Sequence, residues 1–500
     1  MAALTEINNF GGIDADRDNL LDECFEDHES FEAVRDFERF LVVGRKGSGK
    51  TAIFRKIIKD RRPDAFALGH TFTDYPWHHH NLQMLKGVPR EECFVQSWKY
   101  LIFITISKIL LNYDQSQPWN ERFLDDLGSI ENFVLDTYGS KDPDLTNLFS
   151  PTRQIHIKPT LGLSLLGVNA GVEVENIAME HLPTVAKEVN DNLEKKILQS
   201  LNPDNLYYVC FDELDLGFSK DDANYPLRLI GLLKAAMQIN NLALENHKKL
   251  NVVIFLRDDI YQFLQFEDKN KLTQGGLVRI EWDTARTKHT LRELMERRFA
   301  KLLSVGEEGA WDLVFNEVQQ MRGNQSKYQH VVDRTMLRPR DMIKFCNEAL
   351  ASYQTNSERT DLIENRDITS ARSNYSQYLV AELDDEMQKH LPNHGSYFEL
   401  LQQLEAVQFS IEEFQHACDA RPELVPEGKT PRKILGELFE FSVIGFYQSG
   451  GAGYGGAQYV FRYKDSRAQF NENAQTYQVH LGLLEAFNLK RYRRSDSTEE

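Results

Sequence analysis

The sequence predicts an α/β fold built on a parallel sheet, and three observations lead to this prediction. A short apolar run at residues 40–43 enters a glycine-rich loop. The segment after the loop, residues 52–58, has apolar residues at helical spacing. Two further continuous apolar runs, 206–211 and 251–256, end in charged residues. Such runs are typical of parallel strands buried on both faces.

The glycine-rich loop reads Gly-Arg-Lys-Gly-Ser-Gly-Lys-Thr and is a complete phosphate-binding motif between a strand and a helix. Its glycines let successive backbone N–H groups face a phosphate, and the start of the next helix adds a positive dipole end. We expect Lys50 to reach the β- and γ-phosphates of a nucleoside triphosphate and the Thr51 hydroxyl to ligate Mg²⁺. The residues predicted to bind the nucleotide are Gly44, Arg45, Lys46, Gly47, Ser48, Gly49, Lys50, Thr51 and Ala52.

The apolar run 206–211 ends in Asp212 and Glu213. An acidic residue at the carboxyl end of a parallel strand lies where ligands bind in open α/β sheets. Asp212 is predicted to hold Mg²⁺ together with Thr51, and Glu213 to polarise the attacking water. A glutamate directly after the metal aspartate favours ATP hydrolysis over phosphorylation of a small molecule. The predicted cofactors are therefore ATP and Mg²⁺, with Glu213 and Lys50 in catalytic roles.

A third strand candidate, residues 251–256, ends in Arg257. An arginine at this strand end is suited to contact the γ-phosphate. It is equally suited to pair with Asp258 or Asp259, and the sequence leaves both interpretations open.

Two more arginines, Arg338 and Arg340, flank Pro339 at a predicted helix start. Proline is natural at a first helical position. Arginines are not explained by capping, because acidic residues are favoured there. The mismatch predicts an anion partner, such as a nucleotide phosphate approached from a helical lid.

Composition bounds the class of protein. The 500 residues are 41% hydrophobic, which implies a large core and two or three domains. The five cysteines show no paired spacing, which disfavours a zinc site and a disulfide framework. No apolar run was expected to span a membrane and no signal peptide is recognisable, so we expect a soluble, cytoplasmic chain without a membrane partner. The net charge of −18 disfavours nucleic-acid binding by the protein as a whole.

The chain is predicted to contain five parts. They are an acidic lead-in (1–38), a nucleotide-binding core (39–285) with an insertion around 115–200, a helical lid (286–392), a winged-helix-like domain (393–490) and a tail (491–500). Strands are also expected at 65–68 and 277–282, and a β-hairpin inserted at 155–174. Helices are expected at 20–37, 92–111, 287–303, 310–321, 339–350 and 371–390. Three histidines at 78–80 lack the spacing of metal ligands.

The last part contains three predicted helices, 398–404, 411–420 and 431–439, followed by two β-rich runs joined by a glycine-rich turn. Ser410 is predicted to cap the second helix, and Thr430 with Pro431 to start the third. Three helices and a hairpin form the winged-helix arrangement. The candidate recognition helix begins with Arg432 and Lys433 but continues with acidic residues. Contact with a protein is therefore at least as well supported as DNA reading.

Residues 45–52, 211–215, 255–260 and 337–341 together resemble an uncharacterised bacterial family of P-loop ATPases. That family is similar to the AAA+ and STAND branches of the additional-strand (ASCE) class, and the resemblance spans roughly residues 10 to 490. It implies an ASCE core, a helical lid, a winged-helix end and ATP hydrolysis. Such proteins are often associated with antiphage or conflict systems. Arg257 departs from the AAA+ pattern, where a polar sensor such as asparagine is expected.

The first functional hypothesis is a Mg²⁺-dependent ATPase whose nucleotide state switches its assembly with itself or with a separate effector chain, in a bacterial defence system. A homo-oligomer is expected, with Arg297 or Arg298 of one subunit completing the next subunit's site. The alternative is a DNA-binding ATPase of the origin-binding or loader type that uses the winged helix. A scaffold that binds ATP without turnover is a third hypothesis, against which Glu213 argues.

Overall fold

The computed structural model describes residues 4–71, 90–112, 116–144, 182–216, 222, 224–284, 287–450, 456 and 458–491. The predicted hairpin at 155–174 and the histidines at 78–80 lie outside these residues. The chain divides into two compact units, each described here by itself. The first unit comprises Met1–Glu26, Lys46–Gly49 and Glu281–Glu500, and the second comprises Asp27–Arg45 and Lys50–Ile280.

The second unit is built on a five-stranded parallel sheet with the order β2-β3-β4-β1-β5. Its strands are β1 (Leu41–Gly44), β2 (Ala65–Thr71), β3 (Leu206–Asp212), β4 (Lys249–Arg257) and β5 (Leu277–Arg279). All five predicted strands are therefore confirmed. Strand β4 lies between β1 and β3, so the carboxyl ends of these three strands share one edge of the sheet.

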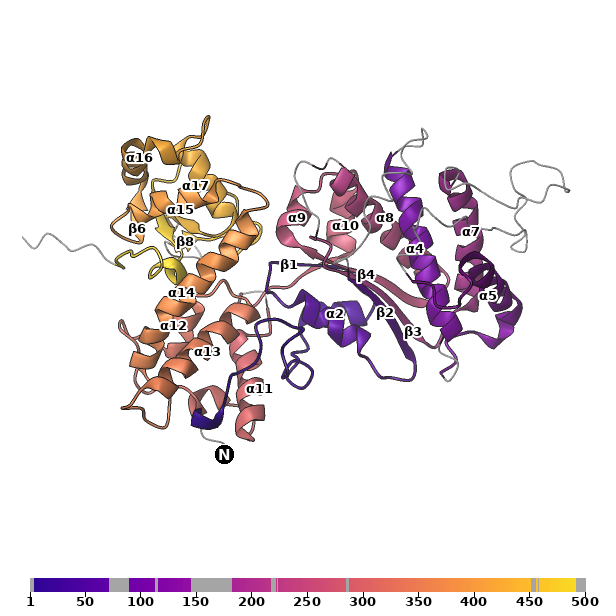
Figure 1. Ribbon diagram of the computed structural model, residues 1–500, viewed down its shortest axis with the longest axis horizontal. Coiled ribbons are helices and arrows are strands. Elements are labelled where there is room, and N and C mark those ends of the chain that lie inside the picture. Colours follow the sequence, from indigo (N-terminus) through magenta and orange to yellow (C-terminus); the bar gives the residue numbers. More distant parts are fainter. Residues whose placement is uncertain are drawn as a thin grey trace, which may run out of the picture. The chain divides into compact units, whose positions relative to one another are not determined.

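Helices cover both faces of this sheet (Figure 1). In the described residues the helices of this unit are α1 (Glu29–Arg35), α2 (Lys50–Ile58), α4 (Arg90–Asn112), α5 (Leu124–Tyr138), α7 (Leu182–Ser200), α8 (Asn224–Glu245), α9 (Asp258–Phe263) and α10 (Lys269–Gly275), with the 3₁₀ turn η3 (Glu121–Phe123). Of these, α5 and α7 pack against α4. The predicted acidic helix at 20–37 is shorter than expected, because in this range only α1 is helical.

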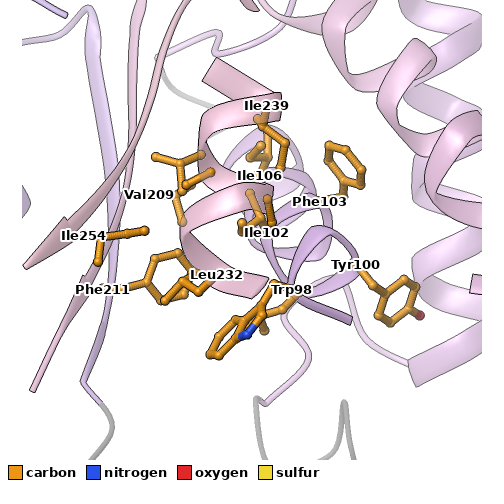
Figure 2. Packing of buried hydrophobic residues seen from close by; sticks show 14 of the residues in the cluster. Trp98, Tyr100, Ile102, Phe103, Ile106, Val209, Phe211, Leu232, Ile239 and Ile254 are labelled. Atoms are coloured by element: carbon orange, nitrogen blue, oxygen red, sulfur yellow. The ribbon is translucent and has the colours of Figure 1, made fainter. Parts of the chain in front are cut away.

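Alternate residues of the strands face opposite helical layers. In β3, Val209 and Phe211 lie in the apolar cluster of α4 and α8, where Trp98 meets the Phe211 ring edge-on at 5.8 Å (Figure 2). The next residue along, Tyr208, stacks on Phe37 on the other side at 5.2 Å. Burial on both faces is the physical reason why the strand is a continuous apolar run up to Asp212.

Helix α4 is long and apolar enough to cross a membrane, which the sequence analysis did not anticipate. Within the described part of the chain, the qualifying window is 94% buried inside the protein. That degree of burial is typical of the core helix of a soluble protein. The helix packs against α8 and α7 in the apolar cluster.

The helical part of the first unit contains α11 (Leu291–Leu303), α12 (Lys327–Val332), α13 (Pro339–Thr355) and α14 (Asn365–Met387), with two 3₁₀ turns, η1 (Leu4–Glu6) and η6 (Ala310–Leu313). The predicted helix at 310–321 is wrong beyond this turn. Phe315 pairs instead with Ile363 in an isolated bridge, and Val318 is 97% exposed.

The C-terminal part combines helices with a four-stranded antiparallel sheet of order β6-β9-β7-β8. Its elements are α15 (His394–Gln402), β6 (Gln408–Ser410), α16 (Ile411–Ala420), η7 (Pro422–Leu424), α17 (Pro431–Glu440), β7 (Ile444–Gln448), β8 (Gln458–Val460), β9 (Thr476–Val479) and η8 (Leu481–Leu483). The predicted caps are confirmed, since Ser410 and Thr430 accept hydrogen bonds from the first turns of α16 and α17. Strands β6 and β9 were not predicted.

Candidate functional site

Lys50 opens helix α2 directly after the glycine-rich loop, in the second unit. Its ammonium group donates hydrogen bonds of 2.9 Å to the carbonyls of Gly44 and Arg45. Burial lowers the pKa of Lys50 to about 8, and the charge of the nearby Arg257 acts in the same direction, while that of Asp212 opposes the shift. The lysine is thus a half-buried cation with backbone partners, and a phosphate is the kind of group that would stabilise its charged form.

Asp212 ends strand β3 in the same unit and is buried. Burial raises the pKa of Asp212 to about 6, although a hydrogen bond from the Thr51 hydroxyl and the charge of Lys50 oppose the rise. Its Oδ2 atom is buried and has no hydrogen-bond partner among the described residues. The structure therefore brings Lys50, Thr51 and Asp212 together, and leaves one carboxylate oxygen able to accept a cation.

Glu213 follows with a backbone φ of +58°, in the left-handed region that glycine favours. Its carbonyl accepts a hydrogen bond from the Leu216 N–H, which closes a tight turn after the strand. A strained, non-glycine residue at a strand end is common at functional positions. The turn places the glutamate next to the metal-binding candidate Asp212.

Arg257 ends strand β4 and is buried. Its guanidinium donates two hydrogen bonds to the Asp259 carboxylate, at 3.0 and 2.8 Å, and one to Asp215 at 3.1 Å. Of the two interpretations left open by the sequence, the structure shows the pairing with Asp259. The other candidate partner, Asp258, pairs with Arg279 instead. Contact with a γ-phosphate stays a prediction.

The tip of the glycine-rich loop, Lys46–Gly49, belongs to the first unit. Gly47 has a φ of +78°, and a Cβ there would lie 2.9 Å from the Cβ of Arg340, so this position requires glycine. The indole N–H of Trp282 donates to the Ser48 carbonyl at 3.0 Å. The loop tip is therefore held by side chains from outside the motif.

Arg338 holds the loop tip from the start of α13. Its Nη1 donates to the Lys46 carbonyl at 3.0 Å and pairs with Glu386 at 2.5 Å, while its Nε pairs with Asp341 at 2.8 Å. The Arg338 side chain is only 1% exposed. Burial alone would lower the pKa of Arg338, but the charges of Asp341 and Glu386 outweigh it and raise the pKa above its usual range.

Arg340, two residues further along, crosses the loop tip. Its Nε donates to the Ile13 carbonyl at 3.0 Å, and its backbone N–H faces the Gly47 carbonyl at 3.4 Å. Its Nη1 pairs with Glu382 of α14 at 3.2 Å. The first unit therefore brings together Arg338, Arg340 and the loop tip. The partners of both arginines are carboxylates and backbone carbonyls, and their contact with a nucleotide phosphate stays a prediction.

Sequence reasoning missed the acidic end of α14. Glu382, Asp385 and Glu386 all bind cations of the loop tip or of the α13 start. Their spacing of three and four residues places them on one helix face, and that spacing was the available signal.

The arginines proposed to reach a neighbouring subunit have partners within the first unit. Arg298 is 3% exposed and pairs with Asp18 at 2.6 Å. Arg297 pairs with the buried Glu26 at 2.8 Å. The acidic lead-in therefore explains the arginine surplus of α11, and of these two arginines only Arg297 retains substantial exposure.

Arg432, a candidate DNA contact, is bound to the backbone of its own domain. Its Nη1 donates to the Ala474 carbonyl at 3.0 Å, and a second bond reaches the Glu472 carbonyl. Lys433, beside it, is exposed. Of the two cations that the sequence offered for DNA contact at the start of α17, Arg432 is therefore engaged within its own domain and Lys433 is exposed.

Comparison with known proteins identifies one domain. Residues 289–384 match the FunZ-associated C-terminal helical domain, a range that includes Arg338, Arg340 and Glu382. The chain is also a distant homologue of a transposon gamma-delta 80.3 kDa protein from Escherichia coli (strain K12). The two are 23% identical over 457 residues, which cover 88% of this chain and 60% of the relative. The chain therefore spans less than two thirds of that relative's length.

Proposed function

We propose that this chain is a Mg²⁺-dependent ATPase with a P-loop NTPase core of the additional-strand class. The observation that carries the proposal is the arrangement at one edge of the parallel sheet. Lys50 and Thr51 follow β1, Asp212 and Glu213 end the β3 side, and β4 lies between the two strands. The Thr51 hydroxyl bonds to the Asp212 carboxylate, so the two predicted metal residues meet.

The residues fit Mg²⁺. This ion binds in phosphate sites through one or two protein oxygens, several waters and the phosphates themselves. Thr51 and the unpartnered Oδ2 of Asp212 supply such oxygens. Within the described ranges no group of three or more His, Cys, Asp or Glu side chains is placed to hold a metal, so a fully protein-ligated site is not proposed there. Bound Mg²⁺ would neutralise charge on the β- and γ-phosphates.

Two variants of the second unit test the proposal. Lys50→Ala removes the lysine ammonium group that is expected to face the β- and γ-phosphates, and should abolish ATP binding measured by calorimetry. Glu213→Gln should retain ATP binding while phosphate release falls by roughly 10²-fold or more, because a general base is lost. Glu245→Gln, an exposed glutamate of the same unit, is the matched control and should behave as the wild type. ATP binding by Lys50→Ala at wild-type affinity would overturn the loop assignment.

We further propose that nucleotide state switches the conformation or assembly of the chain in the cytoplasm, as the regulatory ATPase of a bacterial defence system with a separate effector protein. The contacts of α13 and α14 with the loop tip support a link between nucleotide and helical domain. Light scattering with and without MgATP tests self-association, and capture of host proteins by Glu213→Gln, with Lys50→Ala as control, tests for an effector. An unchanged mass and no ATP-dependent partner would overturn the switch.

A DNA-binding ATPase remains the second candidate. The three helices α15–α17 and the hairpin of β7 and β8 follow the order of a winged-helix domain. The matched Escherichia coli relative is named as a transposon protein. A salt-sensitive mobility shift of duplex DNA, lost in Lys433→Glu, would support this function. No shift at low salt would exclude it.

A further inference from the structure

One carboxylate at the end of α14 binds both the loop tip and the helix that crosses it. The Glu382 Oε2 atom lies 3.4 Å from the Lys46 Nζ and 3.2 Å from the Arg340 Nη1. The Glu382 side chain is only 14% exposed, so water screens these two ion pairs weakly. Asp385 adds a second, more exposed contact to Lys46 at 3.0 Å.

The position of Arg340 is fixed independently of Glu382. The Ile13 carbonyl accepts from its Nε, and its Cβ and Cδ pack over Gly47. An arginine anchored in this way keeps its guanidinium at the loop tip when a carboxylate is neutralised. Glu382 therefore controls the charge available at this position more than the position itself.

The cations around the loop tip are fully neutralised by acidic side chains. Three cations, Lys46, Arg338 and Arg340, face four carboxylates. The carboxylates are Asp341, Glu382, Asp385 and Glu386. A triphosphate held by the loop carries several negative charges and would attract the same cations. Carboxylate and phosphate then compete, because both bind Lys and Arg by charge-assisted hydrogen bonds.

We propose that the Glu382 carboxylate competes with the triphosphate for Lys46 and Arg340 and thereby limits the affinity for ATP. The proposal rests on the proposed ATPase function of the loop. Removal of the Glu382 charge should therefore strengthen nucleotide binding, whereas damage to the fold would weaken nucleotide binding.

The test uses Glu382→Gln in the full chain, with fluorescent ATP and ADP analogues titrated in the presence of Mg²⁺. The dissociation constant for ATP should fall by about 3- to 10-fold, the range expected for one partly screened charge pair. The change for ADP should be smaller, because it carries less negative charge. The gain should shrink between about 0.05 M and about 0.5 M salt, since salt screens the interaction.

Glu348→Gln is the matched control. Glu348 pairs with Lys344 on α13 and accepts a hydrogen bond from Asn374. Its exposed fraction, 16%, is close to that of Glu382, but neither of its partners is a residue of the loop tip. This variant should leave the dissociation constant unchanged. Glu382→Asp keeps the charge and should stay within about 2-fold of the wild type, about 0.4 kcal/mol by the conversion of affinity to free energy.

The outcomes separate the two proposals. A wild-type protein that binds neither nucleotide overturns the ATPase assignment itself. Wild-type binding combined with equal or weaker binding by Glu382→Gln overturns the competition and leaves the ATPase proposal standing. Should Glu382→Gln unfold at a lower temperature than Glu348→Gln, the salt dependence of wild-type binding decides. If the carboxylate competes with ATP, salt should weaken ATP binding less in the wild type than in the double variant Lys46→Gln/Glu382→Gln. ATP binding that is more sensitive to salt in the wild type than in the double variant overturns the proposal.

Discussion

Arg257 in the second unit and Arg338 in the first unit each pair with two carboxylates, yet their surroundings differ. Asp215 and Asp259, the partners of Arg257, retain solvent contact. Asp341 and Glu386, the partners of Arg338, are buried, and a third bond reaches the Lys46 carbonyl. A buried ion pair is costly to break, because the remaining charge stays without water. The comparison therefore indicates that Arg338 maintains the fold, whereas Arg257 can change its ion-pair partners at a lower cost in stability.

The largest expected effect comes from breaking the buried cluster. Arg338→Ala leaves Asp341 and Glu386 charged and buried, and should lower the free energy of unfolding by about 3–5 kcal/mol. Urea unfolding followed by circular dichroism measures the loss. Arg292→Ala is the control, since its pairs with Glu296 and Asp312 are more exposed, and should cost less than about 1 kcal/mol. Equal losses for the two variants would contradict the comparison.

A smaller effect of opposite sign is expected at Asp212. Its folded pKa of about 6 exceeds the ordinary aspartate value of about 3.9, so the folded state favours the protonated acid and loses stability as pH rises between these values. Asp212→Asn cannot ionise, and should stabilise the protein by about 1–3 kcal/mol at pH above about 6. The gain should disappear below pH of about 4. Thermal unfolding across this pH range measures it, and Mg²⁺-dependent ATP binding should be lost in the same variant.

The smallest effect on stability is expected at Arg257. Arg257→Ala should cost about 1–2 kcal/mol, because its partners can take up water. The same variant also tests the effect of Arg257 on Lys50. Burial lowers the pKa of Lys50 to about 8, and the charge of Arg257 contributes to this shift. ATP affinity should fall as pH rises through that value, since the lysine loses its proton. In Arg257→Ala this fall should move to higher pH, whereas Glu348→Gln should leave it in place. An unmoved profile would contradict the link between Arg257 and Lys50.

Local sequence patterns predicted the parts of the fold that depend on neighbours in the chain. Apolar runs identified four strands of the parallel sheet, and the segment 277–282, which also contains Arg279 and Glu281, identified the fifth. Ser410 and Thr430 identified two helix starts. Strand β9 escaped prediction because its pairing with β6 joins Gln408 to Gln478, which lie 70 residues apart. No local period encodes such a pairing.

The candidate site also contains residues that local sequence patterns predicted and residues that they did not. Lys50, Thr51 and Asp212 were predictable, because each follows a recognisable strand or loop. Glu382 was not, because its role depends on a contact with Lys46 more than 300 residues earlier in the chain. Its neighbours at 385 and 386 were readable only as an acidic helix face, which is usually solvated.

The left-handed backbone at Glu213 has an evolutionary consequence. Glycine adopts this conformation with no steric penalty, while a residue with a side chain pays of order 1 kcal/mol. Random substitution combined with selection for folding alone would therefore drive position 213 toward glycine or asparagine. A lineage that keeps glutamate there must draw a benefit from the carboxylate that exceeds this penalty. On the proposed ATPase function, homologues that no longer hydrolyse ATP should have glycine or asparagine at this position before they lose the glycine-rich loop.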